Sequence, residues 1–342
     1  MRLLWDMFGS GEKIWKADLS ELKNSGLGEK LSQNIFFERK KINPEEEWDA
    51  LEKEEIKIIP FFSADYPALL KESPYPPALL YIKGALDLNT APAIAIVGAR
   101  KCSEYGKQVA YSFSRDLTRA GITIVSGMAF GIDSAAHQGA LDASGKTIAV
   151  LGNSLDDENI YPANNLGLSR EIAKSGALLS EYPPKTQAGK ITFPARNRII
   201  AGVSLGTLVV EAGEKSGALL TAKMALEANR EIFSIPGPIF SEVSRGTNSL
   251  IQSGAKTVTS IKDVLEELNL ENSAFLKKEK GPKPNPSSQE KIILKILSTD
   301  PVHIDKMAKL AKLQTAEVAA TLSMMEIKGW TKNIGGQNYI LL

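Results

Sequence analysis

The stretch Ile94-Ala-Ile-Val-Gly-Ala-Arg100 decides the fold of this chain. Residues 94–97 are apolar and mostly β-branched, which is typical of a buried parallel strand. Gly98 and Arg100 follow at once, and the pattern beyond them predicts a helix over residues 105–120. Ligands of a doubly wound sheet bind at the carboxyl ends of such strands, and an arginine there suits phosphate. A plain Rossmann turn with a surface arginine explains the same residues equally well, because the full G-x-G-x-x-G pattern is absent.

Strand-like and helix-like segments alternate from residue 91 onward. The predicted strands are residues 93–97, 122–126, 147–151, 177–181, 207–211 and 231–235. Their spacing of roughly 25 to 30 residues is the length of a strand-helix unit. This alternation predicts an α/β fold: an extended Rossmann-like, doubly wound, mostly parallel sheet with helices on both faces. Residues 56–59 and 79–82 are expected to add strands, the first at an edge.

The composition of the chain predicts further domains on either side of residues 44–270, which we expect to hold the sheet. Residues 1–43 are predicted to be a small, truncated helical domain that resembles a SAM-like or helix-hairpin-helix bundle. Residues 271–288 lack an apolar period and are rich in helix breakers, so they are predicted to be a linker that proteases cut first. Residues 289–342 are predicted to form a winged helix. Its third helix, residues 315–327, carries few charges, which favours protein docking over reading of a DNA groove.

Overall charge and cysteine content exclude several classes of protein. The chain has 342 residues, of which 43% are hydrophobic and 24% charged, and its formal net charge is +1. Nucleic-acid binding would therefore have to rest on local clusters of cations. Cys102 is the only cysteine, no signal peptide is evident, and no stretch approaches the ~20 apolar residues of a membrane span. We expect a cytoplasmic protein without a membrane segment.

The strongest cluster of candidate binding residues lies between residues 185 and 198. Its cations are Lys185, Lys190, Arg196 and Arg198, and no acidic residue occurs between Tyr182 and Val210. Phe193 lies among these cations, and Asn197 separates the two arginines. Cations that follow phosphates, with an aromatic ring that can stack a base, suit a single nucleic-acid strand. A solvated basic loop is the alternative, and the place of the cluster near a sheet's carboxyl end disfavours it.

Two further turns at strand ends offer backbone N–H groups to an anion. The first turn, residues 126–133, enters a helix and contains Ser126, Gly127, Phe130 and Gly131. The second turn, residues 211–217, ends in Ser216 and Gly217, which open the following helix.

Residues that could carry catalysis are few. His137 falls one turn into a helix, which favours a structural histidine over a proton carrier. Glu211 could act as an acid–base residue or could hold an arginine in place. Gly145-Lys-Thr147 is not a phosphate-binding P-loop, because it precedes a strand and lacks the glycine five positions earlier. The two histidines are far apart, so no metal site is expected, and neither a catalytic pair nor a cofactor is expected.

Taken together, the motifs resemble the DNA-processing protein A family (DprA, also called Smf). The matching pieces are Ile96-Val-Gly-Ala-Arg100, Ser126-Gly-Met-Ala-Phe-Gly-Ile-Asp133 with His137, Tyr161-Pro162, Ser180-Glu-Tyr-Pro183, Phe193-Pro-Ala-Arg-Asn-Arg-Ile-Ile200, Val210-Glu-Ala with Ser216-Gly217, Ile235-Pro-Gly237 and Gly246-Thr-Asn248. The resemblance implies an extended Rossmann fold and a homodimer that binds single-stranded DNA in a basic pocket. It also implies protection of incoming single strands in natural transformation, loading of RecA recombinase, and no enzymatic activity.

The resemblance also implies roles for particular residues. Arg100, Lys190, Arg196, Asn197 and Arg198 would contact the DNA backbone. By the resemblance, Gly127, Phe130, Gly131 and Gly217 would shape the pocket around them. The strand-end turns described above add Gly98, Ser126 and Ser216 to the predicted site, and the basic cluster adds Phe193 as a stacking ring. Leu250 and Ile251 would join a homodimer contact, with ordinary core packing as the alternative.

Two enzyme classes are the rivals of this interpretation. Glu211, Gly213 and the arginines are similar to nucleotide phosphoribohydrolases of the lysine-decarboxylase-like fold. Those enzymes carry a Pro-Gly-Gly-x-Gly-Thr-x-x-Glu stretch, whereas Gly206-Thr-Leu-Val-Val-Glu211 lacks its Pro-Gly-Gly and has one extra residue before the glutamate. A nicotinamide oxidoreductase would need a dinucleotide fingerprint, which this chain lacks.

Overall fold

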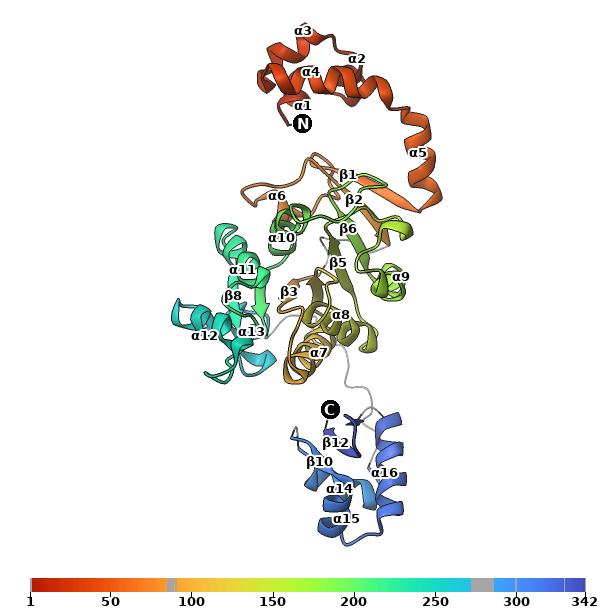
Figure 1. The fold of residues 1–342 in the computed structure, drawn as a ribbon, viewed down its shortest axis with the longest axis vertical. Helices are drawn as coiled ribbons and strands as arrows, with labels where there is room; N and C mark the ends of the chain where they lie inside the picture. The colour runs from red at the N-terminus through yellow and green to blue at the C-terminus, as the bar shows by residue number, and fades with distance from the viewer. Residues whose placement is uncertain are drawn as a thin grey trace. The chain divides into compact units, whose positions relative to one another are not determined.

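The computed structural model describes residues 2–84, 89, 91–271, 286–298, 300–328 and 330–341, which fall into two compact units on either side of residue 278 (Figure 1). Each unit is considered by itself. Most of the predicted linker, residues 272–285, lies outside the described residues, as do most of the protease sites predicted there. Ser288 already belongs to the first helix of the C-terminal unit.

A nine-stranded sheet organises the N-terminal unit, with the strand order β1-β2-β6-β5-β4-β3-β7-β8-β9. Strands β3 to β9 run parallel, while β1 and β2 pair antiparallel at one edge. The strands are β1 (Ile56–Pro60), β2 (Leu79–Gly84), β3 (Ala93–Val97), β4 (Thr123–Ser126), β5 (Thr147–Leu151), β6 (Ala177–Ser180), β7 (Gly206–Val209), β8 (Glu231–Ser234) and β9 (Lys256–Thr257). The predicted class and the mostly parallel sheet are confirmed; β9 was not foreseen, because two exposed residues carry no hydrophobic pattern.

The central strand β3 has no polar side chain because helices cover the sheet on both faces. Ala93, Ala95 and Val97 pack into one core with α10 (Thr192–Gly202) and α11 (Gly217–Glu227). Ile94 and Ile96 pack into a second core with α7 (Glu104–Arg119), α8 (Ile132–Asp142) and α13 (Ile261–Glu267). Alternate residues of a strand point to opposite faces, so a continuous apolar run can serve both cores.

The order of the strands reverses at β3, which has β4 on one side and β7 on the other. The chain therefore builds the sheet in one direction from β3 to β6 and in the other direction from β7 to β9. Loops leave the two strands at this switch point toward opposite faces, which opens a crevice outside their carboxyl ends. This is the place that the opening sequence motif predicted for a binding site.

The structure differs from the sequence prediction in two helices that concern function. The basic cluster is not all loop: α10 begins at Thr192, so Phe193, Arg196 and Arg198 lie on a helix. Pro194 is compatible with this because it occupies the first turn, where its missing N–H leaves no hydrogen bond unmade. Residues 245–252, for which no helix was predicted, form helix α12 (Arg245–Gln252).

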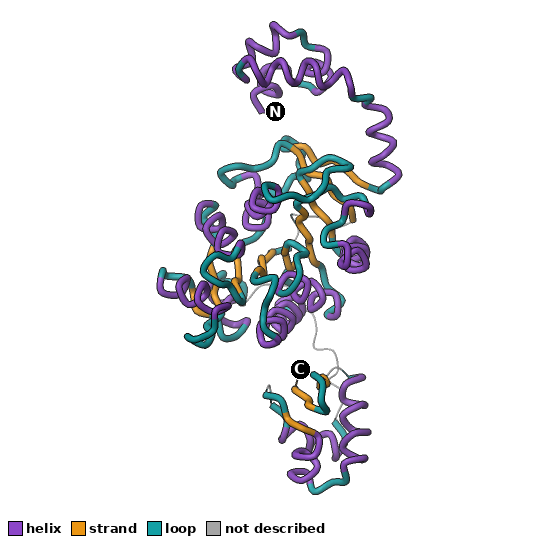
Figure 2. Tube along the Cα trace, in the orientation of Figure 1, coloured by secondary structure: helices purple, strands orange, loops and turns teal. Residues whose placement is uncertain are grey.

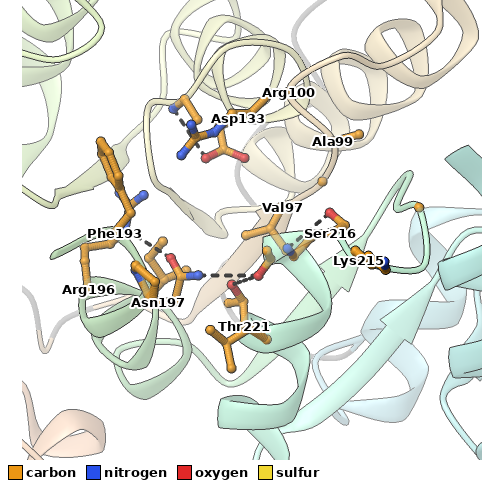
Figure 3. A pocket seen from close by; sticks show the side chains of 18 of the residues that line it. Val97, Ala99, Arg100, Asp133, Phe193, Arg196, Asn197, Lys215, Ser216 and Thr221 are labelled. Carbon is orange, nitrogen blue, oxygen red and sulfur yellow. Dashed lines mark hydrogen bonds between the residues drawn. The ribbon is translucent and has the colours of Figure 1, made fainter. Parts of the chain in front are cut away.

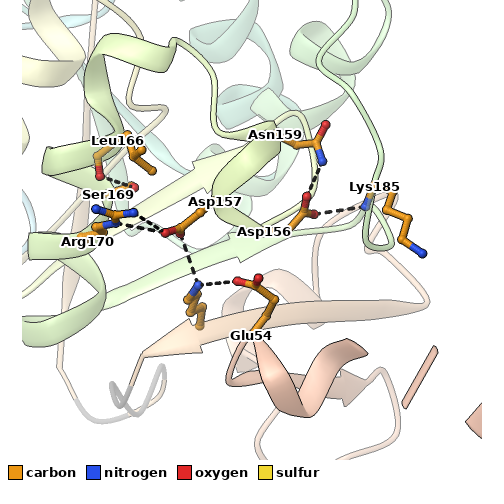
Figure 4. A network of polar contacts seen from close by, with 9 residues as sticks. Glu54, Asp156, Asp157, Asn159, Leu166, Ser169, Arg170 and Lys185 are labelled. Carbon is orange, nitrogen blue, oxygen red and sulfur yellow. Dashed lines mark hydrogen bonds and ion pairs between the residues drawn. The ribbon is translucent and has the colours of Figure 1, made fainter. Parts of the chain in front are cut away.

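The antiparallel edge of the sheet is held by charges that neutralise one another (Figure 4). Lys83 of β2 lies 3.1 Å from Glu54 and 3.4 Å from Asp157. Asp157 also accepts from Arg170 of α9 (Leu166–Ser175), at 2.9 Å. Partial burial would raise the pKa of Asp157, but hydrogen bonds and charges from Arg170 and Lys83 hold that pKa below its usual value.

Short helices make up residues 2–53 almost entirely (Figure 2). They are α1 (Arg2–Phe8), α2 (Gly11–Lys16), α3 (Leu19–Leu22), the π-helical turn η1 (Lys23–Leu27), α4 (Glu29–Glu38), the 3₁₀ turn η2 (Arg39–Lys41) and α5 (Pro44–Lys53). Leu4, Ile14 and Leu22 are buried in a small core of their own. The helical character predicted for this segment is confirmed.

Among its described residues, the C-terminal unit contains three helices and a three-stranded sheet of order β10-β12-β11. The elements are α14 (Ser288–Ile296), β10 (Val302–His303), α15 (Ile304–Ala311), α16 (Thr315–Ile327), β11 (Thr331–Asn333) and β12 (Asn338–Leu341). Ile293, Met307, Val318 and Leu322 are buried among these elements. This is the arrangement of the predicted winged helix.

Candidate functional site

A pocket of about 670 Å³ lies at the carboxyl ends of β3 and β7. We call it the crevice. Its walls come from the turn after β3, from the loop and first turns of α10, and from the start of α11 (Figure 3). Gly98 and Arg100 lie on one wall, Lys190, Phe193 and Asn197 on a second, and Ser216 and Gly217 on the third. The crevice thus brings together segments that are more than a hundred residues apart in sequence.

Four exposed cations line the crevice: Arg100, Lys101, Lys190 and Lys215. Within the part of the chain that the structure describes, none of these four lies within ion-pairing distance of a carboxylate. The guanidinium carbon of Arg100 lies 5.0 Å from the centre of the Phe193 ring. Cations without protein counter-ions at the mouth of a concave site attract an anionic ligand.

The third wall of the crevice is the N-terminus of α11. The Ser216 hydroxyl caps this helix by accepting from the Ala218 N–H at 3.3 Å, and Gly217 is exposed at its first position. Asn197 of α10 donates from its side-chain amide to the Gly217 carbonyl at 3.4 Å, which links the two helices across the crevice. The partial positive charge of a helix N-terminus favours phosphate at this wall.

Lys101 and Lys215 are site residues that the sequence interpretation missed. Lys215 lies inside the turn over residues 211–217, which was already expected to bind an anion, so its charge was visible there. Lys101 directly follows Arg100. Neither residue belongs to the basic cluster at 185–198, and only the fold brings them to the same crevice.

Arg196 lies beneath the crevice and is 4% exposed. One end of its guanidinium group donates to two backbone carbonyls, that of Gly127 at 2.8 Å and that of Val150. Its Nε donates to the Asn197 side chain at 3.2 Å. Burial lowers the pKa of Arg196 to about 10, and the nearby positive charge of Arg100 contributes, while Asp133 counters both. A buried guanidinium with these partners is a structural element of the site.

Asp133 and His137 of α8 share the buried layer with Arg196. Asp133 accepts from the N–H groups of Gly127 at 3.2 Å and of Ala129 at 3.4 Å. Burial raises the pKa of Asp133, whereas Arg196 and these N–H groups counter the rise. The N–H groups of this turn were expected to meet an anionic ligand; two of them meet the carboxylate of the protein itself.

His137 is fully buried, and its Nδ1 lies 2.7 Å from the Thr147 hydroxyl. That hydroxyl donates to the Ile124 carbonyl at 2.8 Å, so it accepts from a protonated Nδ1. Burial and the positive charge of Arg196 lower the pKa of His137 to about 3. The structural role favoured for this histidine agrees with its neutral, buried state.

Several other predicted site residues hydrogen-bond or pack within the protein. The two Arg198 contacts to Glu181 are 2.6 Å each, and the Ser126 hydroxyl donates to the Ile96 carbonyl at 2.6 Å. Gly131 has a φ of +80°, and a Cβ atom there would lie 2.5 Å from the Ala99 carbonyl. The structure therefore changes what can be expected of Arg196, Arg198 and Ser126, which hydrogen-bond within the protein, although Nη1 of Arg198 has no partner among the described residues. Arg100, Lys190 and Asn197 line the crevice.

Glu211 is bound by the start of α7 rather than by an arginine. It is 4% exposed, and its two carboxylate oxygens accept from the Ser103 N–H at 2.8 Å and from the Ser103 hydroxyl at 2.5 Å. Glu211 also packs closely against Gly106, because a Cβ atom added to that glycine would lie 2.4 Å from the carboxylate carbon of Glu211. Glu211 therefore anchors the start of α7 to the end of β7.

Phe130 lies outside the crevice. It is 45% exposed and, together with Tyr161, lines a smaller hollow to which Phe193 also contributes. Leu250 and Ile251 lie on α12, half-buried, and Leu250 packs against one core of the sheet.

Two kinds of feature are absent from the described ranges. No helix there is long and apolar enough to cross a membrane. No group of three or more histidine, cysteine or acidic side chains that could hold a metal ion occurs among the same residues.

Comparison with known families gives two matches along the chain. The model described as DNA recombination-mediator protein A matches residues 57–269, and the model described as DprA winged helix domain matches residues 277–337. Among curated proteins, the DNA processing protein DprA of Bacillus subtilis is 44% identical over 66% of this chain and 76% of its own length. The protein Smf of Escherichia coli is 35% identical over 93% of this chain and 86% of its own.

Two solved structures are similar as well. DNA processing protein A of Streptococcus pneumoniae superposes with a TM-score of 0.65 at 40% identity, covering 73% of this chain and 87% of that one. DNA processing protein A of Helicobacter pylori, solved to explain its single-stranded DNA binding mode, superposes with a TM-score of 0.56 at 32% identity. That match covers 63% of this chain and 95% of the other.

Proposed function

Since this chain belongs to the DNA recombination-mediator protein A family, we propose that its crevice binds single-stranded DNA. The observation that carries the proposal is the set of four exposed cations around an aromatic ring at the switch point of the sheet. Arg100, Lys190 and Lys215 contact successive phosphates, and Asn197 with the start of α11 supports one of them. Arg196 and Arg198 act behind this surface, by holding its loops.

A single strand fits this surface better than a duplex does. Its backbone bends easily and its bases are free to stack on Phe193, whereas the bases of a duplex are already stacked on one another. Contacts to phosphate carry no sequence information, so we expect little dependence on sequence and a strong dependence on salt.

In the cell, we propose that the protein protects incoming single strands during DNA uptake and loads RecA recombinase onto them. Membership of a family described as recombination mediators supports this role. The test is nucleation of RecA filaments on single strands coated with a single-strand-binding protein. The parent should shorten the lag before filament growth, and Arg100→Ala should not.

We further propose a homodimer in which Ile251 of α12 contributes to the contact. Ile251 is the cleaner probe, because Leu250 packs against the core of its own unit. The Ile251→Glu variant should be monomeric by light scattering, while Lys223→Glu, at an exposed position of α11, should dimerise like the parent. A folded Ile251→Glu variant that remains dimeric would refute this contact.

The rival function, release of a free base from a nucleotide, loses its candidate acid–base residue. Glu211 is buried and both its oxygens are engaged by Ser103. A hydrolase would need that carboxylate to reach its substrate.

The decisive experiment compares fluorescence anisotropy of labelled single- and double-stranded oligonucleotides of equal length. We expect tighter binding of the single strand at every salt concentration. Equal affinity for single and double strands, together with release of free base from nucleoside monophosphates, would favour the hydrolase over DNA binding.

A further inference from the structure

A second aromatic site adjoins the crevice. Phe130, Tyr161 and Phe193 line a hollow that shares Arg100 and Arg196 with the crevice, and Phe193 borders both. The three rings come from three different segments: the turn after β4, the loop after β5, and α10. Exposed aromatic rings that gather beside a charged groove are costly in water, so their position calls for a ligand.

The ring of Phe193 is engaged inside the protein. The Arg100 guanidinium lies over it, 5.0 Å from its centre, and the Tyr161 ring lies 5.4 Å from it at an angle of 46°. A base that stacks on Phe193 shares the ring with Arg100 and Tyr161, so Phe193 has less free surface to offer than an unpaired ring. Tyr161 and Phe130 have free ring surface on which a base can stack, since they are 46% and 45% exposed.

Hydrogen bonds from Asn165 connect the segments that carry Tyr161 and Phe130. The Asn165 side-chain amide donates to the Met128 carbonyl at 2.8 Å and to the Ser134 hydroxyl at 2.9 Å. Asn165 follows Tyr161 in its loop, whereas Met128 and Ser134 flank Phe130. The amide therefore joins the two segments that present the rings, and little ordering is needed when a ligand stacks there.

We propose that Tyr161 and Phe130 form a stacking platform for a nucleobase next to the crevice. The inference rests on the proposed binding of single strands and extends it by one nucleotide, whose phosphate lies at Arg100. The hollow holds only about 20 Å³, so the base lies on the exposed rings rather than inside it. The arginines in the same hollow disfavour a cationic ligand. A neutral heterocycle attached to phosphate can stack on the rings while its phosphate pairs with an arginine.

The test separates base contacts from phosphate contacts. Affinity is measured for a thymidine oligonucleotide and for a strand of the same length whose sugars carry no bases. Tyr161→Ala should weaken binding of the thymidine strand about tenfold, as expected for one stacked base. On the abasic strand the same variant should bind like the parent, because the phosphates are unchanged.

The matched control is Tyr105→Ala, which removes a 55% exposed tyrosine on α7 that lines neither site. It should leave both affinities unchanged, and Tyr161→Phe should keep the affinity of the parent. Equal losses on the two strands would overturn the platform, and so would no loss on the thymidine strand. If the parent protein binds a duplex as tightly as the thymidine strand, the proposed function is wrong. That result differs from the two that would contradict only the platform.

A Tyr161→Trp variant gives a direct readout that does not depend on loss of affinity. Its fluorescence, after subtraction of the parent's, should be quenched when the thymidine strand binds and unchanged when the abasic strand binds. Quenching by both strands would contradict stacking.

Discussion

The rim and the floor of the crevice use the same residue types in opposite ways. On the rim, Arg100, Lys101, Lys190 and Lys215 are exposed and have no carboxylate partner within the described ranges. On the floor, Arg196 is buried, donates to two backbone carbonyls and lies near Asp133. The difference shows that the partners of a cation, and not its presence in a motif, decide whether it can hold a ligand or holds the protein.

The antiparallel edge of the sheet supports the same rule. Lys83 and Arg170 are as basic as the rim residues, yet both are paired with Asp157 (Figure 4). Rim substitutions should therefore change binding, whereas floor substitutions should change stability. Four predictions test this division.

Removal of Arg196 should have the largest effect, and the effect should be on stability. Arg196→Ala leaves the carbonyls of Gly127 and Val150 without this donor and Asp133 without a cation. Breaking a buried charged network of this kind typically costs about 3 to 5 kcal/mol of the free energy of unfolding. Urea denaturation measures the loss, and Arg100→Ala is the control, with a change below about 0.5 kcal/mol.

One outcome would contradict the assignment of Arg196 to the floor. If Arg196→Ala unfolds at the same urea concentration as the parent and binds single strands with a shallower salt slope, Arg196 contacts phosphate directly.

The buried histidine should make the stability of the floor depend on pH. Burial and the charge of Arg196 lower the pKa of His137 to about 3 in the folded protein, whereas an unperturbed histidine has a pKa of about 6.5. As pH falls below 6.5, the unfolded chain takes up a proton that the folded protein refuses until about pH 3, so stability is lost through that window. Between pH 7 and pH 5 this residue should lower the free energy of unfolding by about 2 kcal/mol.

Urea denaturation at the two pH values compares His137→Gln with His303→Gln. His303 belongs to the C-terminal unit, so His303→Gln leaves the buried His137 in place and should keep the loss of stability that His137 causes. His137→Gln should show less, and an identical dependence in all three proteins would show that His137 is not the group responsible.

On the rim, Arg100→Ala should weaken single-strand binding by about 1 kcal/mol at 0.1 M salt, without loss of stability. The slope of log affinity against log salt should become shallower by about 0.7, the value for one phosphate of a single strand. Arg170→Ala is the matched control, because it removes an arginine that is paired with Asp157 at 2.9 Å. A parental slope in Arg100→Ala would remove this residue from the rim.

The smallest effect is expected for Arg198, whose charge Glu181 neutralises at 2.6 Å. Arg198→Ala should leave the salt slope of the parent unchanged, whereas Glu181→Gln frees the arginine and should steepen the slope by up to about 0.7. If Arg198→Ala flattens the slope while Glu181→Gln changes nothing, the ion pair opens when DNA binds and the comparison of rim and floor does not extend to Arg198.

Much of the architecture could be predicted from the sequence because continuous hydrophobic runs indicate buried strands. The strands 93–97 and 147–151 were predicted with the bounds that the structure has, since both are buried on two faces and consist of apolar and β-branched residues. The start of α10 was missed because its polar residues and Pro194 mask the helical period. Lys101 and Lys215 were missed because sequence distance hides their convergence.

By itself, the sequence determined the α/β class, the position of the switch-point strand and the set of motifs that identify the family, because these depend on local patterns of burial and on residue types at fixed spacing. Only the tertiary structure decided which charges are free. Arg100, Arg196 and Arg198 look alike in the sequence, but Arg100 lies at the rim, Arg196 meets carbonyls of strands far away in the chain, and Arg198 meets Glu181. The electrostatic state of a cation depends on its partners in space, and those partners come from segments that the fold alone brings together.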